Sequence, residues 1–205
     1  MNYRSAKRRC AVDFKSLNLP ISEQQALEIL AKKGFSTVEV DLVQLARQPM
    51  RPPFIVPRYK RGAKLSEFPH FVDCSSFTQW LYNMLGILLP RRSIQQRECG
   101  QVVNQENTSA GDLVFTRGYI NYYRTDPLQG VGHVGIVTDC KTVIHATSGE
   151  RAIQEVALKD FIDGPKFRGA RRYISHDRKV VTLELPYESE VQQSDDIRWI
   201  ILQSL

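Results

Sequence analysis

The hydrophobic pattern of this 205-residue chain changes from a helical to a strand-like period near Gly111, which limits the folds open to it. Before that point, residues 75–85 carry apolar side chains at i, i+3, i+4, i+7 and i+8, namely Phe77, Trp80, Leu81, Met84 and Leu85. After it come short β-branched segments separated by turns, at residues 112–116, 131–138, 142–147, 153–158 and 170–174. Helices followed by successive antiparallel strands predict an α+β domain.

Other segments carry weaker patterns. They are a helix at residues 21–34, a second helix at 38–47, an irregular segment at 48–69 and a candidate strand at 180–185. Ser22 can cap the first helix and Gly34 can end it. The five prolines from Pro49 to Pro69 forbid regular helix there. Residues 195–205 are apolar enough to pack, but the pattern does not predict where.

Charge and composition narrow the function classes. The chain has a net charge of +6, and 42% of its residues are hydrophobic, as in ordinary globular proteins. Its basic residues occur in short clusters rather than a long tract, which disfavours nucleic acid as a partner. The charge is compatible with a solvated surface or with an anionic partner such as a carboxylate-rich cell wall. No apolar run is long enough to span a bilayer.

The basic residues 1–20 are not followed by an apolar segment, so the sequence predicts no secretory signal peptide. The expected location is therefore the cytoplasm, or the cell wall reached by a route other than classical secretion.

Four cysteines are present: Cys10, Cys74, Cys99 and Cys140. They form no C-x-x-C pair and have no zinc-like spacing with the histidines, so no metal site is implied. Their low density predicts free thiols rather than a disulfide scaffold, with one disulfide among Cys10, Cys99 and Cys140 as the open alternative.

Cys74 lies directly before the clearest helix, in the stretch FVDCSSFTQW. A helix N-terminus stabilises a thiolate, but a nucleophile also needs a base, and the base needs an orienting group. His133 in HVGIV and His145 in TVIHAT are separated by a short turn, so they can lie on neighbouring antiparallel strands and complete a Cys-His-His triad. The alternative is a buried core cysteine with two ordinary strand histidines.

Five segments match the patterns of one known family in chain order. DCSSFTQWLYNMLGILLPRRSIQQ is similar to D-C-S-G-F/L-V, a helix and then G-I-x-L-P-R-x-S-x-x-Q. AGDLVFT, HVGIV, TVIHATSG and FRGARRYI are similar to P-G-D-L-V-F-F, H-V-G-I-Y/V, F-I-H-A-S and G-A-R-R-V. These patterns, over residues 38–174, resemble the NlpC family of papain-like cell-wall cysteine peptidases.

The resemblance implies a papain-like α+β fold in which a catalytic helix packs on a small antiparallel sheet. The implied organisation is an N-terminal extension with one helix at residues 1–37, a catalytic domain at 38–175 and a C-terminal extension at 176–205.

The resemblance also implies the catalytic roles. Cys74 would be the nucleophile, His133 the base and His145 the residue that orients His133. His70 and His176 match no family position, so ordinary loop roles are expected for them. The reaction would proceed through a thioester and would need no metal or organic cofactor.

Three further residues receive roles from the same resemblance. Tyr59, in YKRGA where the family has Y-x-x-G-G, would help to bind the oxyanion. Asp73 and Ser75 would help to bind the peptide substrate. Ser76 replaces a family glycine, and its side chain would either narrow the cleft or face solvent.

The implied substrate is a peptidoglycan stem peptide or muropeptide, cut most often between γ-D-glutamate and a diamino acid. One alternative is an amidase or acyltransferase of the same fold that acts on another substrate, for example as a delivered toxin. A second alternative is a non-catalytic wall-binding module, which would not need all of Cys74, His133 and His145.

Two long segments, residues 48–69 and 117–130, immediately precede Cys74 and His133. Long loops in a compact domain are commonly functional. The hypothesis is that RGYINYYRTDPLQG, residues 117–130, forms one wall of the substrate cleft and sets specificity. The alternative is a loop whose tyrosines simply pack on the surface.

Overall fold

The structure is a computed structural model that describes residues 3, 5, 8–139, 141–149 and 151–205. Its contacts divide the chain into two units. We call them the central unit (Asp41–Leu81 and Leu89–Tyr173) and the terminal unit (Met1–Val40, Tyr82–Leu88 and Ile174–Leu205). Helix α3 (Cys74–Met84) begins in the central unit and ends in the terminal unit.

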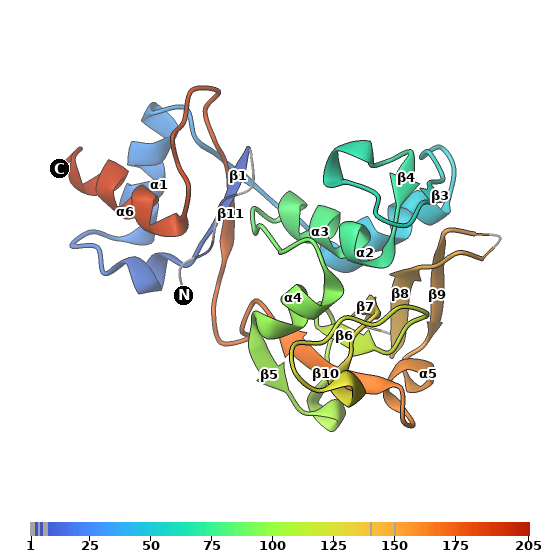
Figure 1. Ribbon diagram of the computed structural model, residues 1–205. Helices are drawn as coiled ribbons and strands as arrows, with labels where there is room; N and C mark the ends of the chain where they lie inside the picture. Colours follow the sequence, from blue (N-terminus) through green and yellow to red (C-terminus); the bar gives the residue numbers. More distant parts are fainter. Residues whose placement is uncertain (1–2, 4, 6–7, 140, 150) are drawn as a thin grey trace. The chain divides into compact units, whose positions relative to one another are not determined.

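An antiparallel sheet forms the middle of the central unit (Figure 1). Its strands are β5 (Gln101–Val103), β6 (Leu113–Thr116), β7 (His133–Val137), β8 (Thr142–Ala146), β9 (Ile153–Ala157) and β10 (Phe167–Arg172). Their order is β5-β10-β6-β7-β8-β9. The predicted meander is confirmed, because β6 to β9 each pair with the next strand in the chain. Strand β10 pairs with both β5 and β6.

The remaining elements of the central unit are short. They are α2 (Leu42–Arg47), α4 (Ser93–Glu98), α5 (Lys159–Ile162), the strands β3 (Arg58–Tyr59) and β4 (Phe71–Val72), and the 3-10 helices η2 (Gln48–Met50), η3 (Leu65–Glu67), η4 (Gln105–Asn107) and η5 (Pro127–Gln129). The predicted helix at 38–47 is wrong in its first residues. Helix α2 begins after Asp41, whose Oδ1 accepts hydrogen bonds from the backbone of Val43 and Gln44 and so caps the helix there.

The terminal unit contains a second antiparallel sheet, in the order β1-β11-β2. Its elements are β1 (Arg9–Val12), η1 (Phe14–Leu17), α1 (Glu23–Lys32), β2 (Ser36–Val38), β11 (Val181–Glu184) and α6 (Ser194–Leu202). Helices α1 and α6 lie side by side (Figure 1). Leu30, Leu183 and Ile197 are fully or almost fully buried in the core between these elements.

The sheet of the terminal unit joins the two segments that are predicted as separate extensions. Strand β11, from the C-terminal segment, pairs with both β1 and β2, so the N- and C-terminal segments share one sheet and one core. The predicted strand at 180–185 is confirmed as β11, and the apolar residues at 195–205 belong to α6 and the turn after it.

The predicted helix at 21–34 is confirmed as α1. Ser22 Oγ accepts a hydrogen bond from the backbone of Gln25, and the Gln25 side chain accepts one from the Ser22 backbone. Gly34, just past the helix, has a φ of 86°, which favours glycine and ends the helix. Among the residues described, no helix is long and apolar enough to cross a membrane.

Candidate active site

Cys74 is the first residue of α3, and its neighbours cap the helix from both sides. Asp73 Oδ1 accepts a hydrogen bond from the backbone of Ser76 (2.8 Å), and Ser76 Oγ accepts one from the backbone of Asp73 (2.9 Å). Ser76 is 3% exposed. Its side chain therefore neither narrows the cleft nor faces solvent, contrary to both expectations, and instead helps to fix the start of the helix.

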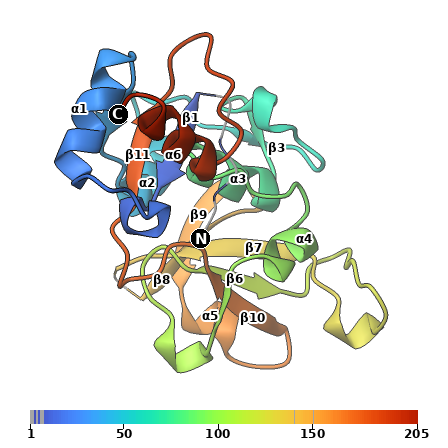
Figure 2. The same ribbon diagram turned by 90° about the vertical axis from the view of Figure 1, so that its left-hand side faces the viewer.

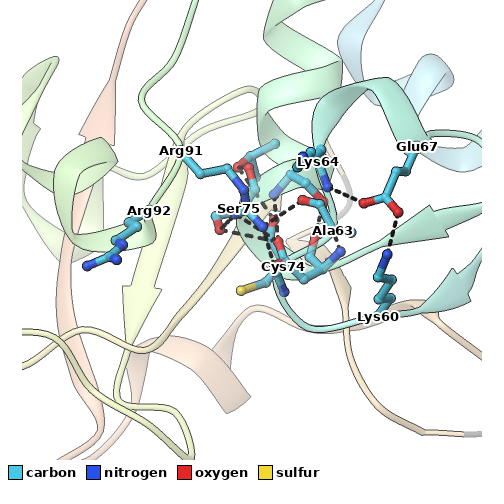
Figure 3. A network of polar contacts seen from close by, with 12 residues as sticks. Lys60, Ala63, Lys64, Glu67, Cys74, Ser75, Arg91 and Arg92 are labelled. Carbon is cyan, nitrogen blue, oxygen red and sulfur yellow. Dashed lines mark hydrogen bonds and ion pairs between the residues drawn. The ribbon is translucent and has the colours of Figure 1, made fainter.

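A guanidinium group holds the residues around Cys74 together (Figure 3). Arg91 donates to Asp73 Oδ1 (3.2 Å) and Oδ2 (2.6 Å), to Ser75 Oγ (2.7 Å) and to the carbonyl of Ala63 (2.6 Å). The second Asp73 oxygen also accepts the Gly62 N–H (2.9 Å). Asp73 and Ser75 are thus satisfied within the protein, which makes them positioning residues for the helix start; their predicted contact with substrate stays a prediction.

Arg91 is expected to matter for stability. Replacing it with methionine leaves the Asp73 carboxylate buried without its main partner. We expect a loss of roughly 2–4 kcal/mol in the free energy of unfolding, below the value for a fully enclosed pair because Arg91 is partly exposed. Denaturant unfolding measures this. The Arg91→Met/Asp73→Asn double variant should recover part of the loss, and a loss under about 0.5 kcal/mol in Arg91→Met would contradict the assignment.

Tyr59 is brought to the same place by a short parallel pairing. Strand β3 pairs with β4, with Tyr59 opposite Val72, one residue before Asp73. The loop between the two strands is held by a Lys60–Glu67 ion pair and by a hydrogen bond from the Lys64 backbone to the Glu67 side chain (Figure 3). Burial, and then the proximity of Cys74 and Asp73, raise the pKa of Tyr59, which keeps its hydroxyl protonated and able to donate.

The two histidines meet on neighbouring strands. His133 begins β7 and His145 lies in β8, and His133 Nε2 is 2.9 Å from His145 Nδ1. Gly135 allows β7 to pack closely on β8 beside this pair, because a Cβ there would lie 2.3 Å from Val143 Cγ1 and 3.2 Å from His145 Cβ. If His133 Nε2 carries the shared proton, Nδ1 is the ring nitrogen left to act as a base.

Phe161, from α5, covers the histidine pair. Its ring centroid is 5.6 Å from that of His133 and 5.0 Å from that of His145. This burial lowers the pKa of His133 to about 3, with His145 as a further cause, and lowers the pKa of His145 to about 4. Both imidazoles are therefore neutral in the resting protein at neutral pH.

The Cys74 thiol contacts the strand segment on both sides of His133. Its Sγ lies 4.0 Å from the Gly132 carbonyl oxygen, and the Val134 backbone also interacts with it. Burial and then Asp73 raise the pKa of the thiol to about 12, against smaller lowering effects from the Val134 and Ser75 backbone. The thiol and both imidazoles are thus uncharged in the resting protein at neutral pH, and a thiolate forms when its proton moves to a base.

These shifts predict how stability depends on pH. Because the folded-state pKa values of His133 and His145 lie below the ordinary 6.5, the unfolded chain binds more protons between pH 6.5 and about 4. The free energy of unfolding is therefore unaffected by the titration of these two histidines above pH 6.5 and decreases as pH falls below that value. We expect on the order of 1–2 kcal/mol per histidine to be lost between pH 7 and pH 5 in denaturant unfolding.

A matched pair of variants checks this dependence. His145→Gln removes one of the two buried imidazoles, so its free energy of unfolding should fall by about 1–2 kcal/mol less than that of the unmodified protein between pH 7 and pH 5. His70→Gln should show the same fall as the unmodified protein, because His70 is exposed and lies outside the cluster. An unchanged pH dependence in His145→Gln would contradict the burial argument.

A cavity of about 360 Å³ opens beside Cys74. Its lining includes Tyr59, Asp73 and Ser75, together with four residues to which no role was predicted: Arg61, Arg91, Arg92 and Gly132. Ile120 and Tyr122 also line it. Ile120 and Tyr122 belong to the insertion at 117–130, which in Figure 2 extends in yellow away from the strands before the chain returns to β7. The insertion therefore contributes to a wall of the cavity, as hypothesised; its effect on specificity stays a prediction.

The remaining cysteines and histidines were given no catalytic role. Cys10, Cys74 and Cys99 form no disulfide, as expected, while Cys140 lies outside the described residues. His70 is exposed and does not line the cavity. Within the described part of the chain, no group of three His, Cys, Asp or Glu side chains could hold a metal ion.

Comparisons with known proteins identify the family of the chain. A sequence model of the NlpC/P60 family matches residues 57–172. The chain is 30% identical over 156 residues to a gamma-DL-glutamyl hydrolase of Bacillus subtilis, covering 76% of this chain and 33% of the relative. It is 33% identical over 103 residues to a gamma-D-glutamyl-L-lysine dipeptidyl-peptidase of Bacillus cereus, covering 50% and 29%. The chain thus spans about a third of the length of these relatives.

Solved structures give the same fold. NlpC1 of Trichomonas vaginalis superposes with a TM-score of 0.50 at 25% identity, covering 64% of this chain and 42% of that one. NlpC2 of the same organism superposes with a TM-score of 0.50 at 23% identity, covering 66% and 49%. The predicted papain-like α+β fold is confirmed.

Proposed function

Because this chain belongs to the NlpC/P60 family of cell-wall peptidases, we propose that it is a cysteine peptidase that hydrolyses amide bonds in the stem peptides of peptidoglycan. One observation carries this proposal: Cys74, at the start of a capped helix, borders a cavity and contacts the residues on both sides of His133, whose ring meets that of His145.

The chemistry follows from these positions. The Cys74 proton moves to His133 Nδ1, and Sγ attacks the carbonyl carbon of the scissile amide. The developing oxyanion accepts a hydrogen bond from the Tyr59 hydroxyl, which lines the cavity. His133 then gives its proton to the leaving amine as the carbon–nitrogen bond breaks, which leaves a thioester.

The second half of the reaction reverses the proton transfers. A water molecule attacks the thioester carbonyl while His133 Nδ1 takes one of its protons. The carbon–sulfur bond breaks, the acid product leaves, and the proton returns to Cys74. Throughout the cycle, the proton shared between His133 Nε2 and His145 Nδ1 keeps the His133 ring oriented.

For the bond, we propose the amide between γ-D-glutamate and the following diamino acid. The names of the Bacillus subtilis and Bacillus cereus relatives, both of which specify a γ-glutamyl bond, support this choice.

The test is digestion of purified muropeptides followed by mass measurement of the products. Cleavage after γ-D-glutamate would give one fragment that ends in glutamate and one that begins with the diamino acid. Cleavage elsewhere in the stem peptide would support the proposed peptidase activity but exclude this bond as the one that is cut. Binding without any cleavage would favour a wall-binding module, and transfer of the acyl group to an added amine would favour an acyltransferase.

A further inference from the structure

The cavity beside Cys74 has an excess of positive charge. Three guanidinium groups line it, those of Arg61, Arg91 and Arg92, against the single carboxylate of Asp73. Arg91 and Asp73 neutralise each other through two hydrogen bonds. Among the residues that the structure describes, neither Arg61 nor Arg92 forms an ion pair, and both are exposed. Two positive charges therefore face the cavity with no acidic partner in the described part of the protein.

Arg92 is held in position by an aromatic ring from the insertion. Its guanidinium carbon lies 4.7 Å from the centroid of the Tyr122 ring, and both residues line the cavity. Stacking on an aromatic face holds a planar guanidinium while leaving its N–H edge free to donate. Figure 3 shows Arg92 outside the hydrogen-bonded network that occupies Arg91.

The backbone on both sides of this contact is fixed. The Arg92 backbone N–H donates to the Gln95 side chain (3.1 Å) at the start of α4. Tyr122 exchanges two backbone hydrogen bonds with Val131, each of 2.9 Å. The insertion also packs closely against Gly132, where a Cβ would lie 2.1 Å from the Ile120 carbonyl oxygen. The stacked pair is therefore part of a built wall rather than the tip of a free loop.

We propose that Arg92, stacked on Tyr122, forms a carboxylate-binding subsite together with Arg61. The substrate is then an acidic peptide that carries a free carboxylate on the residue next to the scissile amide. A guanidinium fork matches the two oxygens of a carboxylate, whereas a carboxamide of nearly the same size presents one acceptor and no charge. The identity of the scissile amide rests on the proposed function; the charge selectivity of the cavity does not.

Two peptides distinguish the possibilities. Both contain a γ-linked D-glutamyl residue followed by a diamino acid, and they differ only in whether the α-carboxyl group of the glutamyl residue is free or amidated. Binding of each to the Cys74→Ala variant is measured by calorimetry, and cleavage of each by the unmodified protein is measured as kcat/KM. The variants tested in both assays are Arg92→Ala, Arg92→Lys and Tyr122→Ala.

The matched control is Arg124→Ala. Arg124 lies in the same insertion and carries the same charge, but it is paired with Glu98 and does not line the cavity. Circular dichroism of each variant checks that the fold is retained.

We expect the free acid to bind about tenfold or more tightly than the amide. This preference should fall to about threefold or less in Arg92→Ala and Tyr122→Ala. It should persist in Arg124→Ala. Arg92→Lys should retain an intermediate preference, since it keeps the charge and loses the fork. Equal binding of the two peptides, or no binding of either, would overturn the proposal. Selective binding without cleavage would uphold this subsite and count against the proposed peptidase.

Discussion

Replacing Cys74 with alanine is expected to abolish amide hydrolysis and leave the fold in place. The sulfur is the nucleophile of the proposed reaction, and the loss of a catalytic nucleophile lowers kcat by roughly 10⁴–10⁶-fold. The fold should survive because the capping of α3 depends on Asp73 and Ser76 rather than on the thiol. The measurements are muropeptide turnover and the thermal unfolding midpoint.

Cys99→Ala is the matched control. Cys99 is an exposed cysteine in the same unit and does not line the cavity, so its removal should leave turnover within about twofold of the unmodified protein. A thiol-reactive probe should then label Cys99 in the Cys74→Ala variant, and Cys74 in the Cys99→Ala variant. Turnover that survives in Cys74→Ala would remove this cysteine from the mechanism.

Replacing His133 with alanine is expected to have the next largest effect. Without His133, the thiol loses the base that the proposed reaction assigns to it, and burial holds the thiol pKa near 12. We expect kcat/KM to fall by roughly 10³–10⁴-fold, because the same residue serves as base and then as acid. Alkylation of Cys74 by a neutral reagent at pH 7 should slow in parallel, which separates the proton-transfer role from substrate binding.

His145 should behave as a positioning residue. His145→Asn keeps an acceptor for the His133 Nε2–H and should cost less activity than His145→Ala, whose loss we place at roughly 10–100-fold. Both variants should shift the acidic limb of the kcat/KM–pH profile, because they change the surroundings of the His133 ring. Equal losses in His145→Asn and His145→Ala, with an unmoved profile, would mean that His145 contributes only packing.

Several features of this protein could be predicted from local sequence alone. The period-3.6 pattern at residues 75–85 predicts α3, since apolar spacing along one segment decides which face is buried. The short turn between HVGIV and TVIHAT predicts that β7 and β8 are neighbours, and so brings His133 and His145 together. These predictions succeed because each rests on residues close in the chain.

Other predictions required knowledge of distant partners and were therefore incomplete. The start of the predicted helix at 38–47 was wrong because a helical apolar pattern cannot show that residues 36–38 pair with β11. The two terminal segments form one sheet through contacts over more than 140 residues of sequence separation, for example between Cys10 and Leu183. A strand's own pattern indicates that it pairs, but not with which strand.

The sequence by itself determined the place of Cys74 at a helix start, the pair of histidine strands and the α+β class, because periodicity, capping and short turns act over a few residues. Only the tertiary structure decided that Arg91 pairs with Asp73 and that Phe161 packs on the two histidines. It also decided that Arg92 stacks on Tyr122 at the cavity that Cys74 lines. Such contacts depend on how separate elements pack and on which polar groups find partners when water is excluded. No local sequence pattern predicts these contacts. Each contact joins two segments, and the helix or strand in each segment would form without the contact.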